Sequence, residues 1–175
     1  MKKVLFFTIL VWPMIVFLFI PSYSFGQATG VTVVSKDGRS LRLYNDYQAV
    51  VVGVSTYQLW PQLPDVAKDA RDVAEGLKKM GFNVKSVMNP TYRQFRIILT
   101  DLVNQIGNKA NRAVLFYYIG HGETAKLAND SLMGYLIPVD CPPLSQDPDG
   151  FLSHAISMKE IEAASTRMKA KHVMM

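Results

Sequence analysis

Two long apolar runs constrain this chain more than any other feature of its sequence. Residues 49–54 (AVVVGV) and 112–119 (RAVLFYYI) are apolar almost throughout and rich in β-branched and aromatic side chains. A continuous apolar run is typical of a strand that is buried on both faces of a parallel sheet. Residues 66–80 and 92–106 lie between these runs, and their apolar side chains recur at helical spacing. Strands that alternate with amphipathic helices predict an α/β domain.

The rest of the main domain continues this alternation. Gly81 is expected to end the first helix, and Ser157 with Glu160 forms a capping box at the start of another. The remaining elements are predicted as a strand at 82–87, a hairpin arm at 132–139, a loop over 141–154, a helix over 158–168 and the opening of a fourth strand at 172–175. This order predicts a doubly wound, mostly parallel sheet with helices on both faces. Ligand-binding and active sites in such sheets lie beyond the carboxyl ends of the strands.

The N-terminus carries the features of an export signal. Lys2 and Lys3 precede an apolar run over residues 4–20, and small residues follow. This pattern predicts a secretory signal over residues 1–26 and an exported protein, periplasmic or extracellular. The alternative is an uncleaved membrane anchor, although the run is interrupted by Pro13 and is at the low edge for spanning a bilayer. Membrane attachment is expected only if the segment stays uncleaved.

An N-terminal β-hairpin is predicted to precede the main domain, which spans residues 46–175. The hairpin covers residues 31–43 within a 27–45 linker, and Asp37-Gly38 supplies its turn. Removing the signal takes away two lysines and no acid, so the formal charge falls from +5 to +3 (5 − 2). The remaining charges are interspersed, with no basic stripe between aromatic residues, which argues against nucleic acid as a partner.

The candidate catalytic residue is His121, which follows the second apolar run. Gly120 and Gly122 flank it, and glycines permit unusual backbone angles and close approach of a substrate backbone. Histidine is the usual general base near neutral pH. The alternative interpretation is a tight turn with an incidental histidine. The position of His121 at the carboxyl end of a buried strand favours a catalytic role.

Several segments together resemble the large-subunit portion of the caspase-like cysteine peptidases (clan CD, peptidase C14: caspases, metacaspases and their bacterial relatives). The matching segments are AVVVGVSTY at 49–57, LPDVAKDA at 63–70, LKKMGFNV at 77–84, FYYIGHG at 116–122 and GYLIPVD at 134–140. The family often has asparagine where this chain has Lys68. The resemblance covers the chain from about Asp46 onward, and it implies a caspase-like fold and peptide or protein substrates.

The resemblance also implies roles for three residues. His121 would be the general base and acid of a Cys–His dyad, and the backbone N–H of Gly122 would help to hold the oxyanion. Asp69 matches the metacaspase acid that lines the pocket for the residue before the cut, which implies a preference for Arg or Lys. Without the resemblance, Asp69 is a solvated first-turn residue that the helix N-terminus stabilises.

The nucleophile is the part of this site that the sequence does not supply. Caspase spacing puts the cysteine about 50 residues beyond the histidine, and no Asp-x-Cys motif occurs in the 54 residues (175 − 121) that follow His121. The single cysteine, Cys141, comes 20 positions (141 − 121) after it and is interpreted as a loop residue. We therefore expect a caspase-like endopeptidase domain whose nucleophile is missing from this chain. The alternative is a catalytically inactive caspase-like binding or scaffold module.

No organic cofactor and no resident metal are expected. His154 and His172 lack metal-ligand spacing with Cys141 or with a carboxylate cluster. Some metacaspases are activated by calcium, and calcium activation stays open here. The acids Asp140, Asp147 and Asp149 do not form an EF-hand pattern, so we interpret them as solvated loop residues.

Overall fold

The central feature of the computed structural model is a parallel sheet of four strands. The structure describes residues 32–34, 36–42, 44 and 46–175. The spatial order is β4-β3-β5-β9, with β3 at Asp46–Gly53, β4 at Asn83–Met88, β5 at Arg112–Ile119 and β9 at His172–Met174. All three pairings are parallel. The predicted α/β architecture is therefore confirmed.

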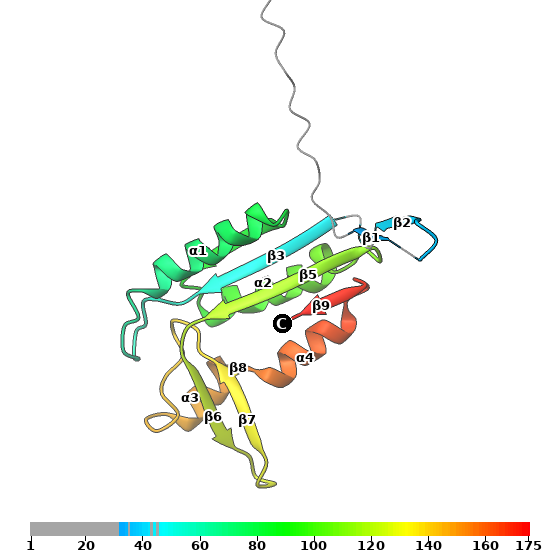
Figure 1. Ribbon diagram of the computed structural model, residues 1–175. Coiled ribbons are helices and arrows are strands. Elements are labelled where there is room, and N and C mark those ends of the chain that lie inside the picture. The colour runs from blue at the N-terminus through cyan, green and yellow to red at the C-terminus, as the bar shows by residue number, and fades with distance from the viewer. Residues whose placement is uncertain (1–31, 35, 43, 45) are drawn as a thin grey trace, which may run out of the picture.

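Helices cover both faces of this sheet (Figure 1). Helix α1 (Val66–Lys79) packs Ala70, Ala74 and Leu77 against Ala49 and Val51 of β3. Helices α2 (Tyr92–Asp101) and α4 (Met158–Arg167) pack on the opposite face, against a core cluster that holds Val50, Val52, Val114, Phe116, Phe95 and Ile161. Successive residues of a strand point to opposite faces, so one apolar run supplies both cores. This is why β3 is apolar without alternation from Ala49 to Val52.

The predicted helix boundaries agree with the structure because the capping residues fold as expected. Gly81 has φ +90° and ends α1, while Phe82 N–H donates to Leu77 O at 3.0 Å and Gly81 N–H to Lys78 O at 2.9 Å. This pair of bonds is a Schellman motif. Ser157 and Glu160 form the predicted capping box of α4. The second helix ends in a π-helical turn, η1 (Leu102–Ile106), within the predicted 92–106 range.

A second, antiparallel sheet extends from the carboxyl end of β5 (Figure 1). It has the order β6-β7-β8, with β6 at Gly122–Lys126, β7 at Leu132–Leu136 and β8 at Ile156–Ser157. The predicted hairpin is confirmed, although its returning arm ends at Leu136 instead of Val139. The short strand β8 was not predicted, since two residues carry no periodicity.

The expected loop over residues 141–154 is wrong in its second half. Helix α3 spans Pro148–His154, and the side chain of Asp147 caps it by accepting a hydrogen bond from Gly150 N–H. Proline suits the first turn of a helix because its missing N–H would have no partner there. The same Pro-Asp composition that indicated a loop therefore starts a helix.

The N-terminal hairpin is present as predicted. Strands β1 (Thr32–Val34) and β2 (Ser40–Arg42) pair antiparallel, and Gly38 takes φ +76° in the turn between them. The predicted signal over residues 1–26 lies outside the described residues. Within the described part of the chain, no helix is long and apolar enough to cross a membrane.

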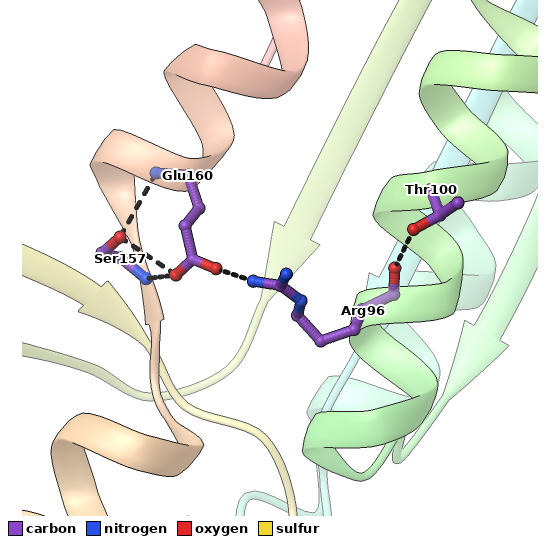
Figure 2. A network of polar contacts seen from close by, with 4 residues as sticks. All are labelled: Arg96, Thr100, Ser157 and Glu160. Carbon is purple, nitrogen blue, oxygen red and sulfur yellow. Dashed lines mark hydrogen bonds and ion pairs between the residues drawn. The ribbon is translucent and has the colours of Figure 1, made fainter.

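A polar network joins α4 to α2 on one face of the sheet (Figure 2). Glu160 accepts hydrogen bonds from the backbone and hydroxyl of Ser157, and its other carboxylate oxygen pairs with Arg96 of α2. The groove beside this pair encloses about 340 Å³ and is lined by Arg96, Leu99, Thr100, Glu160, Ala163 and Arg167. This groove contains none of the predicted site residues.

Candidate active site

His121 lies at the point where the sheet connections reverse direction. From β3 the chain runs to β4 on one side, and from β5 it runs to β9 on the other. The crevice beyond the carboxyl ends of β3 and β5 is therefore the topological switch point, where ligands bind in open α/β sheets. His121 comes two residues after β5, and the loop after β3 supplies its neighbours.

The imidazole of His121 is held by residues of the β3–α1 loop. Its Nε2 lies 2.9 Å from the backbone oxygen of Pro61. The rings of Tyr57 and Trp60 lie with their centroids 4.8 Å and 5.4 Å from that of the imidazole. A carbonyl oxygen only accepts hydrogen bonds, so this contact places the proton on Nε2. The other nitrogen, Nδ1, then keeps the lone pair that a general base needs.

Two tyrosine hydroxyls hold the backbone of His121. Its N–H donates to Tyr57 Oη at 2.8 Å, and Tyr118 Oη donates to its carbonyl oxygen at 2.8 Å. Tyr118 Oη also lies 3.0 Å from the carbonyl oxygen of Ile137. Burial raises the pKa of both phenols above the ordinary range, so both hydroxyls stay protonated and Tyr118 keeps its donor proton. The strand end that carries the histidine is thus fixed at both of its peptide groups.

Gly120 has a packing role beside His121, and neither flanking glycine takes a left-handed backbone angle. Neither Gly120 nor Gly122 has a positive φ. A Cβ on Gly120 would lie 2.5 Å from Tyr118 Oη and 2.6 Å from Tyr57 Oη, which no side chain tolerates. Gly120 is therefore required so that the two hydroxyls can approach the backbone. Gly122 is the exposed first residue of β6, and a Cβ there would meet only an ordinary contact at 3.5 Å.

The β3–α1 loop is itself held by polar side chains. Asn89, at φ +51°, accepts hydrogen bonds from Ser55 N–H at 2.8 Å and Thr56 N–H at 3.1 Å through Oδ1. The amide of Gln62 bonds both the N–H and the carbonyl of Tyr57. These contacts keep Tyr57, and hence the histidine beside it, in place.

Comparisons with known proteins were consistent with this geometry. A protein-family model described as "Caspase domain" (Peptidase C14) matches residues 47–173. The chain belongs to the caspase domain family. A search of curated proteins found no match. Among solved structures, the chain is similar to protein GSU0716 from Geobacter sulfurreducens, with 16% identity, a TM-score of 0.52, and coverage of 73% of this chain and 47% of that one. The chain thus spans about half the length of that protein.

Membership in the caspase domain family rests on a match that covers most of the described residues. It also accounts for the sheet, because the matched segment runs from β3 to β9. The likeness to the Geobacter protein, at 16% identity, is a likeness of fold.

In this caspase domain, Asp69 and His121 are not joined by any contact among the described residues. Asp69 lies exposed in the first turn of α1, and its N–H donates to Asp65 O at 3.0 Å. Its side chain forms no hydrogen bond or ion pair within the described part of the chain. The loop that holds the imidazole leads directly into α1, so both residues lie at the carboxyl end of the sheet.

Cys141 is buried and is not placed as a nucleophile. Its side chain has no exposed area, and its Sγ faces the carbonyl oxygens of Pro142 at 3.5 Å and Phe151 at 3.9 Å. Burial, and secondarily the charge of Asp140, raises the pKa of the thiol to about 12. A nucleophilic cysteine needs the opposite shift. The backbone oxygen of Cys141 has a structural role, because it accepts a hydrogen bond from Trp60 Nε1 at 2.9 Å.

Two of the three acids, Asp140 and Asp147, bind N–H groups at helix N-termini, which corrects their interpretation as solvated loop residues, whereas Asp149 is exposed. Asp140 Oδ1 accepts a hydrogen bond from Tyr92 N–H, the first residue of α2, at 2.7 Å. Asp147 caps α3, and Asp149 lies in its first turn. Carboxylates at helix N-termini satisfy N–H groups that have no partner within the helix. Among the described residues, no group of three or more His, Cys, Asp or Glu side chains is arranged to hold a metal ion.

The two remaining histidines have local partners. His154 is the last residue of α3 and not a loop residue, and its Nδ1 lies 2.9 Å from Gly150 O within the same helix. His172 lies in β9 as predicted, with Nδ1 2.7 Å from Tyr44 Oη. Neither approaches His121.

Sequence reasoning missed the aromatic residues that surround the histidine. Tyr118 is one residue of the apolar run at 112–119, where strand alternation places it on the same face as Phe116 and marks no further role. Tyr57 and Trp60 lie in a loop, where no periodicity marks a contact 64 positions (121 − 57) away in the chain. The one local signal was Asn89, since asparagine before proline at a strand end favours a special backbone angle.

Proposed function

We propose that this caspase domain is the histidine-bearing part of a cysteine endopeptidase that uses a Cys–His dyad and cuts after Arg or Lys. The observation that carries this proposal is the geometry of His121. A histidine at the switch point donates from Nε2 to a backbone carbonyl, lies beside two aromatic rings and has Nδ1 available as a base. A carbonyl that fixes the tautomer does the orienting work that an acid does in other hydrolase triads.

The proposed reaction is acyl transfer to a thiol followed by hydrolysis. Nδ1 of His121 takes the proton of the thiol, the sulfur bonds to the scissile carbonyl carbon, and the C–N bond breaks as the imidazolium protonates the amine. Water then attacks the thioester, with His121 as base, and releases the acid and the free thiol. The exposed N–H of Gly122, one residue beyond the base, is proposed to donate to the oxyanion in both steps.

The nucleophile is proposed to follow β9. This strand lies beside β5 with Met174 opposite Leu115. His121 comes six residues after Leu115 (121 − 115), so a strand continued in that register reaches the level of His121 about six residues after Met174. A cysteine there would lie next to the imidazole. Cys141, by contrast, is the only thiol in this chain and is enclosed.

Asp69 is proposed to select the residue before the cut. It is exposed at the carboxyl end of the sheet, and its side chain has no ion pair within the described residues, so it is available to a cationic side chain. A carboxylate in the pocket favours Arg or Lys over neutral side chains. Asp69→Ala should therefore cost more on basic substrates than on neutral ones, and a preference for acidic residues would refute the assignment.

The test compares this chain with a chain that continues through the next strand, using fluorogenic peptides that end in Arg or Lys. We expect no turnover from residues 1–175 and turnover from the extended chain. His121→Ala in the extended chain should reduce the rate on the order of 10⁶-fold, as loss of a dyad member does in serine proteases. His154→Ala is the matched control, because it removes a histidine that lies outside the site.

Two outcomes would contradict the proposal. Turnover by the 175-residue chain that disappears in Cys141→Ala would make Cys141 the nucleophile. An extended chain that carries a cysteine after β9 and still fails to cleave would favour the alternative function, a peptide-binding module without catalysis.

Export is proposed as the setting in which this domain acts. The support is the basic start, the apolar run and the small residues before Gln27. N-terminal sequencing of protein from its native host should find a start near Gln27 or Thr29. An intact Met1 in a membrane fraction would instead identify an anchor.

A further inference from the structure

A second cavity is lined in part by Trp60, whose ring lies beside His121. It encloses about 290 Å³ and is lined by Trp60, Glu123, Pro143, Leu144 and Ser145. Three of these residues come from the segment after Cys141, one from the β3–α1 loop and one from β6. Three stretches that are far apart in sequence thus meet here.

Trp60 lines this cavity and also contacts the histidine. The centroid of its ring lies 5.4 Å from that of the imidazole at an interplanar angle of 34°, and its Nε1 donates to Cys141 O at 2.9 Å. This hydrogen bond ties the indole to the segment that also supplies Pro143, Leu144 and Ser145 to the cavity. A group bound in the cavity therefore contacts an indole ring that also lies beside the imidazole.

Glu123 is the one charged residue that lines the cavity. It follows His121 by two positions, so both side chains leave the same side of an extended chain. Its Oε1 accepts a hydrogen bond from the neighbouring Thr124 N–H at 3.2 Å. No Lys, Arg or His within the described residues forms an ion pair with it. The cavity therefore combines a carboxylate that lacks a cation with an aromatic ring and apolar walls.

We propose that this cavity is a subsite for a lysine or arginine side chain of a bound peptide, distinct from the Asp69 pocket. The inference rests on the proposed function, because it takes the bound chain to be a peptide that lies across His121. The aliphatic stem of the side chain packs on Pro143 and Leu144. The cationic head lies between the Glu123 carboxylate and the Trp60 ring, where ion pairing and cation–π attraction act together.

Other side chains fit this cavity less well. An apolar side chain would take water from the Glu123 carboxylate without giving it a partner, which costs free energy. An acidic side chain would face a like charge. The peptide recognised at this site therefore carries a second basic residue besides the one at the cut.

Trp60 supplies its own readout for a binding test. The chain has two tryptophans, Trp12 and Trp60, so the full chain with Trp12→Phe reports on Trp60 alone. Its fluorescence is titrated with the blocked tripeptides Ac-Ala-Lys-Ala-NH₂ and Ac-Ala-Nle-Ala-NH₂, which differ only in the charged head group. We expect the lysine peptide to bind about three- to tenfold more tightly. In the Asp69→Asn background, which removes the other proposed pocket for a cation, Glu123→Gln should bring that ratio to about one, and Glu162→Gln, which changes an exposed carboxylate on α4, should leave it unchanged.

The outcomes separate the subsite from the proposed catalysis. Equal binding of the two peptides, a ratio that survives Glu123→Gln, or a ratio abolished by Asp69→Asn instead would each overturn the subsite. These results leave the hydrolysis assay of the extended chain unaffected. If the extended chain fails to cleave but the Glu123-dependent preference is present, the proposed peptidase activity is wrong and the subsite stands as a peptide-binding site.

Discussion

In the parallel sheet, strand β3 buries four consecutive apolar residues, Ala49 to Val52, to 1% exposure or less. Helices on both faces complete this packing, and the charged residues of the two central strands lie at one end, where Asp46 is opposite Arg112. In the region around the small sheet β6-β7-β8, the side chains of Tyr118 and Trp60 donate hydrogen bonds to backbone oxygens, and Tyr57 accepts one from the backbone N–H of His121. The first region is held by non-directional burial, and the second depends on directional contacts.

This difference assigns separate tasks to the two regions. Burial of apolar area stabilises the sheet but does not orient a side chain. Hydrogen bonds contribute less stability each, about 0.5–1.5 kcal/mol, but they define angles. The imidazole of His121 needs a defined direction, and it is supplied by the region with directional contacts. Substitutions in the two regions should therefore have different signatures.

The largest expected effect comes from the apolar region. Phe95 is fully buried in α2, with ring centroids 6.2 Å from Phe116 and 5.9 Å from Tyr118. Phe95→Ala should lower the free energy of unfolding by about 3–5 kcal/mol, measured by urea denaturation. Ile97→Ala, at an exposed position of the same helix, should stay within about 0.5 kcal/mol. A loss below about 1 kcal/mol for Phe95→Ala would mean that burial does not dominate here.

The directional region should respond to loss of one hydroxyl. Tyr118→Phe removes the hydroxyl that lies within hydrogen-bond distance of the backbone oxygens of His121 and Ile137, and should cost about 1–3 kcal/mol. Hydrogen exchange should accelerate in β6 and β7 more than in β3. Tyr117→Phe, one residue earlier and more exposed, is the control and should change neither. Uniform acceleration across both sheets would remove the distinction between the regions.

Alkaline pH should weaken the directional region through Cys141. An unfolded thiol ionises near pH 8.5–9, whereas burial raises the pKa of Cys141 to about 12. The stability that the neutral thiol contributes is therefore present below pH 9 and is lost as the pH rises toward 12, at about 1.4 kcal/mol per pH unit. Cys141→Ala should remove this slope from urea unfolding measured between pH 8 and 10.5. A thiol reagent should label the native protein slowly and the urea-unfolded protein fully, and rapid native labelling would contradict the burial.

The smallest effect on stability is expected where β3 and β5 begin, at the end of the parallel sheet opposite His121. Arg112 donates from Nη2 to Asp46 at 2.7 Å, and this hydrogen bond lowers the pKa of the carboxyl. The pair contributes stability above the unfolded aspartate pKa of about 3.9, and that stability is lost as the pH falls through the lower folded value. Asp46→Asn should cost about 1 kcal/mol at pH 7, because the carboxylate is partly exposed.

The free energy of unfolding of Asp46→Asn is compared with that of the parent chain at several pH values. Asp37→Asn, in an exposed pair with Arg39, should cost almost nothing at any pH. The difference between Asp46→Asn and the parent chain should shrink as the pH is lowered. A difference that stays constant down to acid pH would show that the charge of Asp46 does not contribute.

Much of the fold was predictable because its signals are local. The apolar runs at 49–54 and 112–119, the Gly81 ending and the Ser157 capping box each depend on residues within a few positions of one another. Helix α3 was missed because Asp147-Pro148 indicates both a loop and a helix start, and packing of Phe151 in the second core decides between them. For the site, His121 was predicted, and its surroundings were not.

The sequence by itself determined the order of strands and helices, the family resemblance and the position of His121 after a buried strand, because periodicity and capping are short-range properties. Only the tertiary structure decided how His121 is held, why Gly120 must be glycine and where Cys141 is enclosed. Those features depend on contacts between residues as far as 60 and 81 positions apart, such as His121 with Pro61 and Trp60 with Cys141. Their geometry exists only once burial has brought the strands together.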